Sequence, residues 1–294
     1  MRYLRHLLHD FIEIYIVALV AACLPERLGA RVVWAGAGLY RFHPDIHQPQ
    51  AAFTSCWPGR VLNDRELRWN YLIEASTAWR LILRRKLSVE HIGQWPEKPG
   101  FIVAGAHYGN GIIMLWSLYA AGLRPRFMLR APEKKLLRYR PALWPWSLLR
   151  FRLIKRLCPD GVVLTGGALN SLQSILEEGQ TTPVVLFDTP APPHHSDWTL
   201  DLGQCAVCLY TGAARIIAKH LDHRHVPVVY FKPDTRPGQA GSRLHIQCLD
   251  ASQWTHQCCS AISDSINQQP EGWLFWPNIE PHLMAASRKH DPHE

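Results

Sequence analysis

The sequence predicts an α/β protein with a mixed, largely parallel sheet flanked by helices, preceded by an apolar N-terminal helix. Short apolar runs such as "FIVAGA" alternate with helical patterns along most of the chain, which is typical of strands covered on both faces. At 294 residues, the chain is long enough to bury one large core. Its 47% hydrophobic and 19% charged residues exclude a disordered chain and a polytopic membrane protein.

The N-terminal segment, residues 1–40, is predicted to form a membrane-associated helix. An apolar run of 11 residues extends from Ile14 to Leu24. A bilayer core of roughly 30 Å needs about 20 residues, so this run is too short to span it. Basic residues before the run and the sequence "VAA" also fit a cleaved signal peptide. Asp10 and Glu13 at the front of the run favour a retained helix that lies at the interface or is half inserted.

The remaining elements follow in order. Residues 41–60 are rich in proline and polar groups and are expected to be a connection, and residues 63–86 show a helical pattern. Strands are expected at residues 101–104, 126–129, 162–164, 183–187, 226–231 and 244–249. Helices are expected at residues 109–121, 168–178, 211–220 and 254–266, and a loop at 189–203. Residues 41–284 are assigned to one α/β domain, and the polar tail, 285–294, is expected to be disordered.

The positive charge of the chain is concentrated in one segment. Residues 124–156 contain 11 Lys and Arg residues and one acid, Glu133, a net charge of +10, so the rest of the chain carries −2 of the total of +8. Trp and Leu alternate with these basic residues, which suits a surface in the headgroup layer of an anionic membrane. A solvated basic helix hairpin is the plainer alternative. Nucleic acid is a weaker candidate partner because no helix-turn-helix, zinc-finger or RNP signature accompanies the patch.

Several other motifs lack residues that a functional site of their kind requires. The eight cysteines are scattered, with a CxxC only at Cys205 and Cys208, so we expect reduced and mostly buried thiols in the cytoplasm. The histidines of "HLDHRH" lack a second cluster of ligands, and no metal site is predicted. "LTGGALNS" lacks the Lys and Ser or Thr of a P-loop. A GxSxG motif and a Rossmann fingerprint do not occur.

His107 and Asp188 are the strongest candidates for chemistry, because each follows a predicted buried strand. His107 comes after "FIVAGA" and Asp188 after "PVVLF". The carboxyl ends of parallel strands share one edge of the sheet, where ligands of open α/β sheets usually bind. A carboxylate there could orient the imidazole or hold a ligand hydroxyl. The plainer alternatives are a structural histidine in a tight turn and an Asx turn at Asp188.

The order of motifs along residues 63–281 resembles a known family. Five blocks carry the resemblance: "AHYGNG", "RFMLRAP", "IKRLCPDGVVL", "LNSLQSILEEGQTTPVVLFDTP" and "EGWLFWPNIEP". Together they resemble the lauroyl/myristoyl acyltransferase family of lipid A biosynthesis, part of the lysophospholipid acyltransferase superfamily. The resemblance implies transfer of an acyl chain from a thioester, expected to be that of acyl carrier protein, to a hydroxyl of a glycolipid or lysolipid. It places the protein on the cytoplasmic face of a bacterial inner membrane, with an anionic membrane surface as a partner.

The resemblance also implies roles for individual residues. His107 would deprotonate the acceptor hydroxyl for direct attack on the thioester, and Asp188 would position the acceptor or the base. Asn110 would shape the turn at the substrate site. Arg130 and Arg156 would bind phosphate or steady negative charge, as a guanidinium can do bidentately. No metal or dissociable cofactor is implied beyond the thioester of the carrier.

One position departs from the family pattern. The family signature is a histidine, then four residues of any type, then Glu or Asp. In this chain the position of the acid is occupied by Ile112. In the family this acid holds the tautomer of the histidine and stabilises the imidazolium. Either Asp188 or another acid substitutes, an unassisted histidine suffices, or catalysis has been lost. The alternative hypothesis is therefore a catalytically inactive relative that keeps the fold and binds lipid as a binding or assembly partner.

Overall fold

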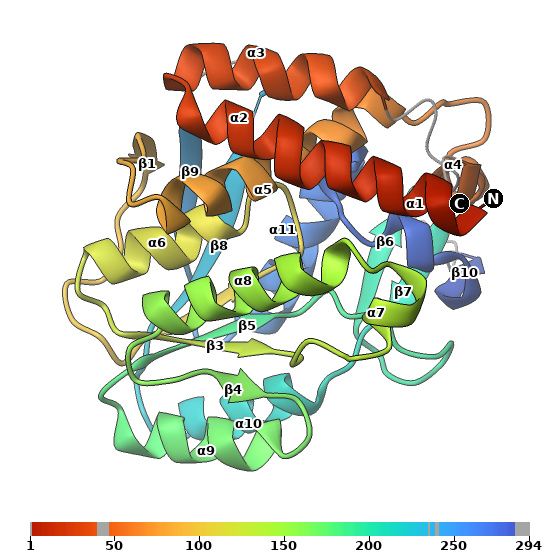
Figure 1. Ribbon diagram of the computed structural model, residues 1–294. Coiled ribbons are helices and arrows are strands. Elements are labelled where there is room, and N and C mark those ends of the chain that lie inside the picture. Colours follow the sequence, from red (N-terminus) through yellow and green to blue (C-terminus); the bar gives the residue numbers. More distant parts are fainter. Residues whose placement is uncertain (1, 40–46, 235, 239–240, 286–294) are drawn as a thin grey trace.

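The computed structural model describes residues 2–39, 47–234, 236–238 and 241–285 (Figure 1). The helices are α1 (Arg2–Phe11), α2 (Ala18–Cys23), α3 (Glu26–Ala37), α4 (His47–Cys56), α5 (Asp64–Ile82), α6 (Ile112–Ala120), α7 (Leu136–Tyr139), α8 (Leu143–Leu157), α9 (Ala168–Glu178), α10 (Gly212–Leu221) and α11 (Trp254–Gln268). A π-helical stretch, η1 (Ile12–Val17), joins α1 to α2, and short 3-10 turns lie at η3 (Pro270–Gly272), η4 (Trp276–Asn278) and η5 (Glu280–His282). The predicted disordered tail lies outside the described residues, except for Ala285.

The main sheet has seven strands in the order β1-β9-β8-β2-β5-β3-β4. Its strands are β1 (Val89–Ile92), β2 (Ile102–Gly105), β3 (Pro125–Leu129), β4 (Val163–Leu164), β5 (Thr182–Leu186), β8 (Val228–Asp234) and β9 (Ser242–Leu249). Neighbouring strands are parallel except for β8 and β9, which are antiparallel. The predicted mixed, largely parallel sheet is therefore confirmed. The edge strand β1 was not predicted from the sequence, because most of its residues are exposed and give no apolar pattern.

Helices cover both faces of this sheet (Figure 1). The side chains of the central strands alternate between two cores, as the period of two along a strand requires. Val103 and Val184 pack with α5, α6 and α8, whereas Ile102 and Val185 pack with α9, α10 and α11. All four residues of β2 are buried, which explains why its sequence is a continuous apolar run.

A second, antiparallel sheet was not predicted. It contains β6 (Thr199–Leu202), β7 (Cys205–Cys208) and β10 (Leu283–Ala285). The expected loop at residues 189–203 is therefore wrong at its end, where β6 forms a hairpin with β7 through a turn at Gly203, whose φ is +60°. The CxxC is part of β7, with all four residues buried. All eight cysteines are free, and five of them are buried, as predicted: Cys56, Cys158, Cys205, Cys208 and Cys258.

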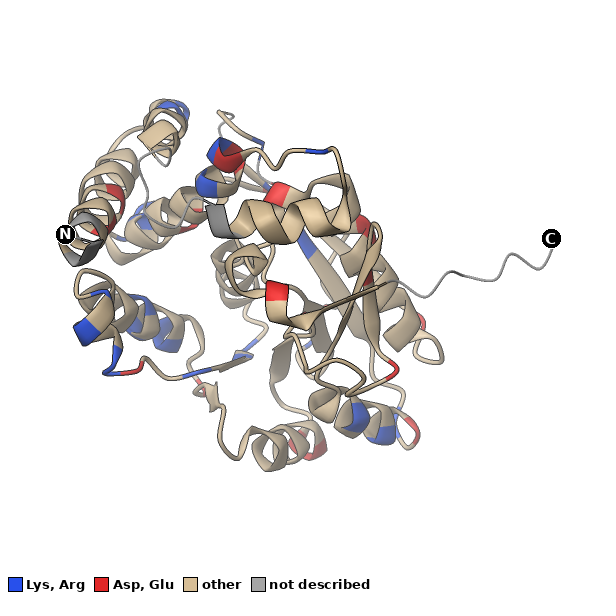
Figure 2. Ribbon diagram, turned by 90° about the vertical axis from the view of Figure 1, so that its right-hand side faces the viewer, with Lys and Arg blue, Asp and Glu red and all other residues tan. Residues whose placement is uncertain are grey.

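The basic segment of the sequence runs from the start of β3 to the end of α8. Figure 2 shows Lys and Arg gathered along this part of the ribbon, near the N-terminal helix. The segment is not a free hairpin, because Trp146, Leu153 and Ile154 on the inner face of α8 are buried. The apolar face anchors this helix to the core, and its basic residues Arg150, Arg152, Lys155 and Arg156 stay exposed.

The N-terminal segment is one helix from Arg2 to Cys23, followed by a break and then α3. The helix packs along the domain, against α3 and α5. Within the described residues, the window from His6 to Cys23 is long and apolar enough to cross a membrane, and 44% of it is buried against the rest of the protein. The predicted connection at 41–60 contains a helix, α4, while residues 40–46 lie outside the described residues.

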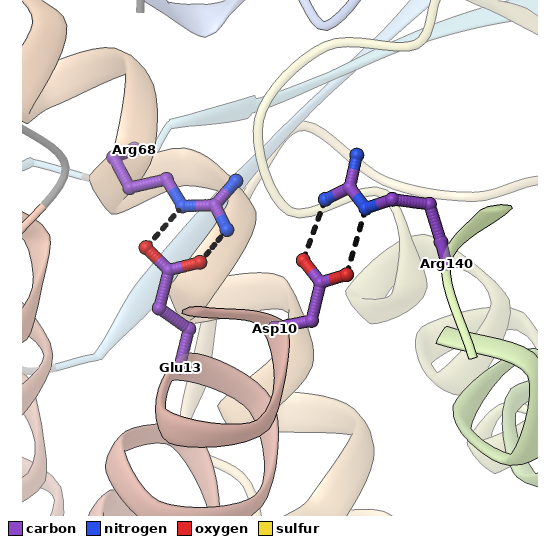
Figure 3. A network of polar contacts seen from close by, with 4 residues as sticks. All are labelled: Asp10, Glu13, Arg68 and Arg140. Carbon is purple, nitrogen blue, oxygen red and sulfur yellow. Dashed lines mark hydrogen bonds and ion pairs between the residues drawn. The ribbon is translucent and has the colours of Figure 1, made fainter. Parts of the chain in front are cut away.

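Two buried carboxylates fix this helix to the domain (Figure 3). Asp10 forms a bidentate pair with Arg140, with Nε–Oδ2 and Nη2–Oδ1 distances of 2.7 and 2.5 Å. Glu13 pairs in the same way with Arg68 of α5, and both carboxylates are fully buried. The opposite side of the helix exposes large apolar side chains: Leu4, Leu8, Phe11, Ile16 and Val20. The carboxylates thus face the protein, and the apolar stripe faces outwards.

Candidate functional site

The residues predicted to carry chemistry meet at one edge of the sheet. β2 and β5 are parallel neighbours with Gly105 opposite Leu186, so the chain leaves both strands at the same edge. A Cβ atom on Gly105 would lie 2.2 Å from the ring of Phe231, so only glycine fits at the end of β2. His107 follows this glycine and Asp188 follows β5. The parallel pairing therefore brings together two side chains that are distant in sequence.

His107 and Asp188 form a closely bonded pair. The distance from Nδ1 of His107 to Oδ1 of Asp188 is 2.8 Å, and the backbone N–H of His107 donates to Oδ2 at 2.7 Å. The Asp188 side chain is fully buried, whereas the His107 side chain is 41% exposed. An ionised carboxylate only accepts hydrogen bonds, so it holds the proton of the imidazole on Nδ1. This arrangement leaves Nε2 as the nitrogen that can take a proton from a substrate.

His107 lines a cavity of about 210 Å³. Most of its wall is apolar, with contributions from α6, β3, β5 and β8: Ile112, Met114, Leu115, Phe127, Leu186 and Phe231. Three charged side chains also reach it: Glu74, Arg130 and Arg150. A cavity of this composition can hold an aliphatic chain and orient it through a few polar groups.

A second cavity, of about 370 Å³, adjoins the first and shares Arg130, Arg150 and two apolar residues with it. Lys135, Trp146 and Phe151 complete its basic and aromatic character. Arg130 pairs with Glu133, while Arg150 pairs with Glu74, which lies on α5. The two cavities together place an apolar pocket beside His107 and guanidinium groups at its border. Such groups can hold a phosphate.

Glu74 and Arg150 were not predicted from the sequence. Glu74 lies in the middle of a helix and belongs to no motif, so nothing in the sequence marks it. Arg150 is one of the 11 cations of the basic segment, and only the phase of α8 distinguishes it from the others. Knowing which face of α8 is buried would have singled it out.

Two of the predicted substrate-binding residues lie elsewhere. Arg156 lines neither cavity and instead donates to the carbonyl of Leu81, near the end of α5. Asn110 is fully buried and also lines neither cavity, since its Nδ2 donates to Oγ1 of Thr77 at 2.7 Å. This bond ties the turn after His107 to α5, which agrees with a role in shaping the turn. The geometry gives no support to substrate binding by either residue.

Ile112, which stands where the family that the sequence resembles has an acid, is the first residue of α6 and is buried. It belongs to the apolar core and to the wall of the cavity. The carboxylate beside His107 is that of Asp188. Among the residues that the structure describes, no group of three or more His, Cys, Asp or Glu side chains is placed to hold a metal ion.

Comparison with known proteins found a distant likeness in fold. No protein-family model matches the chain, and no curated protein matches it. Among solved structures, the fold is similar to the crystal structure of the 1-acyl-sn-glycerophosphate (LPA) acyltransferase PlsC from Thermotoga maritima. The alignment has 15% sequence identity and a TM-score of 0.38, and covers 93% of this chain and 99% of that chain. At this identity and score the likeness assigns no activity to this chain.

Proposed function

We propose that this protein is an acyltransferase that moves a fatty acyl chain from a thioester to a hydroxyl of a glycolipid or lysolipid. The observation that carries the proposal is the pairing of His107, which lines an apolar cavity, with a buried carboxylate. The imidazole supplies a base, the carboxylate orients it, and the cavity offers room for an acyl chain. The motif resemblance to the lipid A acyltransferases suggests the same reaction.

The proposed step is a direct transfer. Nε2 of His107 takes the proton of the acceptor hydroxyl, and the oxygen attacks the carbonyl carbon of the thioester. The C–O bond forms, the C–S bond breaks, and the leaving thiolate receives the proton from His107. Asp188 stabilises the imidazolium that exists between these events. A positioned general base of this kind contributes about 10²–10⁴-fold to the rate.

The cations at the border of the cavity are assigned to an anionic substrate. Arg130 and Arg150 reach the cavity of His107, so they take the phosphate-binding role that the sequence assigned to Arg130 and Arg156. Both already pair with a carboxylate, and a phosphate would compete for them with its several acceptor oxygens. A lysolipid, a phosphorylated glycolipid and the phosphopantetheine of acyl carrier protein all carry such a group.

The outer face of the N-terminal helix is assigned to the membrane. Leu4, Leu8 and Phe11 are about half exposed or more, and Ile16 and Val20 extend the same apolar stripe. The basic segment lies near this helix (Figure 2) and can contact anionic headgroups. We propose that the helix lies in the interface of a bacterial inner membrane, on the cytoplasmic face, where acyl carrier protein delivers the chain.

Acyl transfer from labelled acyl carrier protein to a mixed extract of glycolipids and lysolipids tests the proposal. His107→Ala is compared with the wild type and with His195→Ala, a control that removes an exposed imidazole outside the cavity. Transfer by the wild type and the control that is lost in His107→Ala supports the proposal. Equal transfer by all three proteins would overturn the role of His107.

A catalytically inactive, lipid-binding relative is the second candidate. It is favoured by Ile112, which occupies the family's acidic position with an apolar side chain. A wild type that binds the lipid extract and transfers no label from any thioester donor would establish this function instead. The cavity and the exposed stripe would then serve binding alone.

A further inference from the structure

We infer that Trp273 is a positioning residue for the pair of His107 and Asp188, a role that rests on the proposed acyl transfer. The indole Nε1–H of Trp273 donates to Oδ2 of Asp188 at 2.9 Å. The Trp273 side chain is fully buried, so this bond forms away from solvent. Trp273 lines neither cavity, so its indole N–H would act through the carboxylate of Asp188.

The carboxylate of Asp188 accepts three hydrogen bonds in a fixed pattern. Oδ2 receives the backbone N–H of His107 and the indole N–H of Trp273, at 2.7 and 2.9 Å. Oδ1 faces Nδ1 of His107 at 2.8 Å. Two donors on Oδ2 leave no room for a proton there and fix the plane of the carboxylate. Oδ1 is then held as an acceptor for Nδ1–H, which selects the tautomer with a free Nε2.

The segment that carries Trp273 is fastened to the turn of His107 on both sides of the indole. Gly109 donates its N–H to the carbonyl of Gly272 at 2.7 Å, and Leu274 donates to the carbonyl of His107 at 2.9 Å. The ring of Phe275 meets the His107 ring edge-on, with centroids 4.7 Å apart. The backbone bonds set the position of the indole relative to Asp188. The 2.9 Å distance from Nε1 of Trp273 to Oδ2 of Asp188 is therefore set by the fold of this segment and not by a flexible side chain.

A matched pair of variants separates positioning from packing. Trp273→Phe removes the donor to Asp188 and keeps an aromatic ring. Trp276→Phe makes the same change in the same segment, but the lost N–H donates to the carbonyl of Pro270 at 2.7 Å. Both tryptophans are fully buried and their rings are in contact, so a general loosening of the segment would affect both variants.

The first measurement is the tautomer of His107 by 15N NMR of histidine-labelled protein. In the wild type we expect Nδ1–H and an unprotonated Nε2 in the neutral imidazole. Trp273→Phe is expected to raise the population of the other tautomer, and Trp276→Phe is expected to leave it unchanged. The inference is overturned if Trp273→Phe keeps the wild-type tautomer, or if both variants shift it equally. The tautomer measurement needs no substrate, so its result does not depend on whether the protein transfers acyl chains.

A second measurement uses folded protein that retains Trp273. The indole N–H resonance of Trp273 should shift in Asp188→Asn, because a neutral amide is a weaker acceptor. The resonance of Trp276 should stay in place, and a Trp273 resonance that does not move would contradict the bond. With an acyl donor, Trp273→Phe is expected to lower kcat about tenfold with little change in KM. An increase in KM with kcat unchanged would also overturn the positioning role.

Discussion

Asp188 holds both the backbone and the side chain of His107, although 81 residues separate them in the chain. Its two oxygens bind the N–H and Nδ1 of the same residue at 2.7 and 2.8 Å. The contact is possible because β2 and β5 are parallel neighbours. The carboxylate that orients the histidine thus comes from an adjacent strand, while position 112 on the following helix is apolar.

Placing an acid at position 112 is expected to harm the protein. Ile112→Asp places a carboxylate in the apolar core, and Nδ1 of His107 is already bonded to Asp188. We expect a loss of about 2–4 kcal/mol in the free energy of unfolding, measured by urea denaturation, and no gain in transfer rate. Ile112→Leu serves as the control and should cost less than about 1.5 kcal/mol. A faster and equally stable Ile112→Asp variant would contradict this expectation, because the histidine would then gain from an acid at position 112.

Arg150 and Arg156 should differ in their effect on substrate binding. Arg150 reaches the cavity of His107, whereas Arg156 bonds to the carbonyl of Leu81. Arg150→Ala is expected to raise KM for a phosphate-bearing substrate about tenfold or more, the value of one charge-assisted hydrogen bond. Arg156→Ala should leave KM unchanged. Steady-state kinetics with donor and acceptor varied in turn would identify which of them carries the phosphate, and a KM effect confined to Arg156→Ala would contradict the assignment.

The ion pair of Asp10 and Arg140 should stabilise α8 as well as the N-terminal helix. Asp10→Asn removes a buried carboxylate that is bonded twice to Arg140, and we expect a loss of about 1–3 kcal/mol. Because Arg140 lies just before α8, amide exchange in α8 should also become faster. Glu90→Gln is the matched control, since its pair with Arg243 is exposed and should contribute less than about 1 kcal/mol. Unchanged exchange in α8 would show that the helix does not support the cavity wall.

Local sequence patterns predicted the sheet and the pairing of His107 with Asp188, because buried parallel strands leave continuous apolar runs and end at a common edge. They could not predict which arginine reaches the cavity. Arg150 and Arg156 are six residues apart on α8, which places them about 120° apart around the helix. Which of the two arginines reaches the cavity therefore depends on the rotational phase of α8, and the buried face of this helix is known only from the structure.

Contacts between segments that are distant in the sequence could not be predicted either. The hydrogen bond from Trp273 to Asp188 joins positions 85 residues apart, and the segment of Trp273 was noted in the sequence only as a block that resembles the acyltransferase family. Asp10 and Glu13 were recognised as unusual in an apolar run, but their partners lie 130 and 55 residues further along the chain. No local periodicity encodes such pairs. The pairs of Asp10 and Glu13 depend on how the N-terminal helix packs on the folded domain.

Acyl transfer by the Asp188→Asn variant measures how far the reaction depends on the carboxylate beside His107. The substitution keeps the size of the side chain and removes the acceptor charge that faces His107, so kcat should fall about 100-fold or more with KM little changed. Asp160→Asn, which breaks a surface pair with Arg124, is the control and should transfer at the wild-type rate. If a folded Asp188→Asn variant transfers as fast as the control, the proposed role of Asp188 is wrong, because the histidine then acts without the carboxylate.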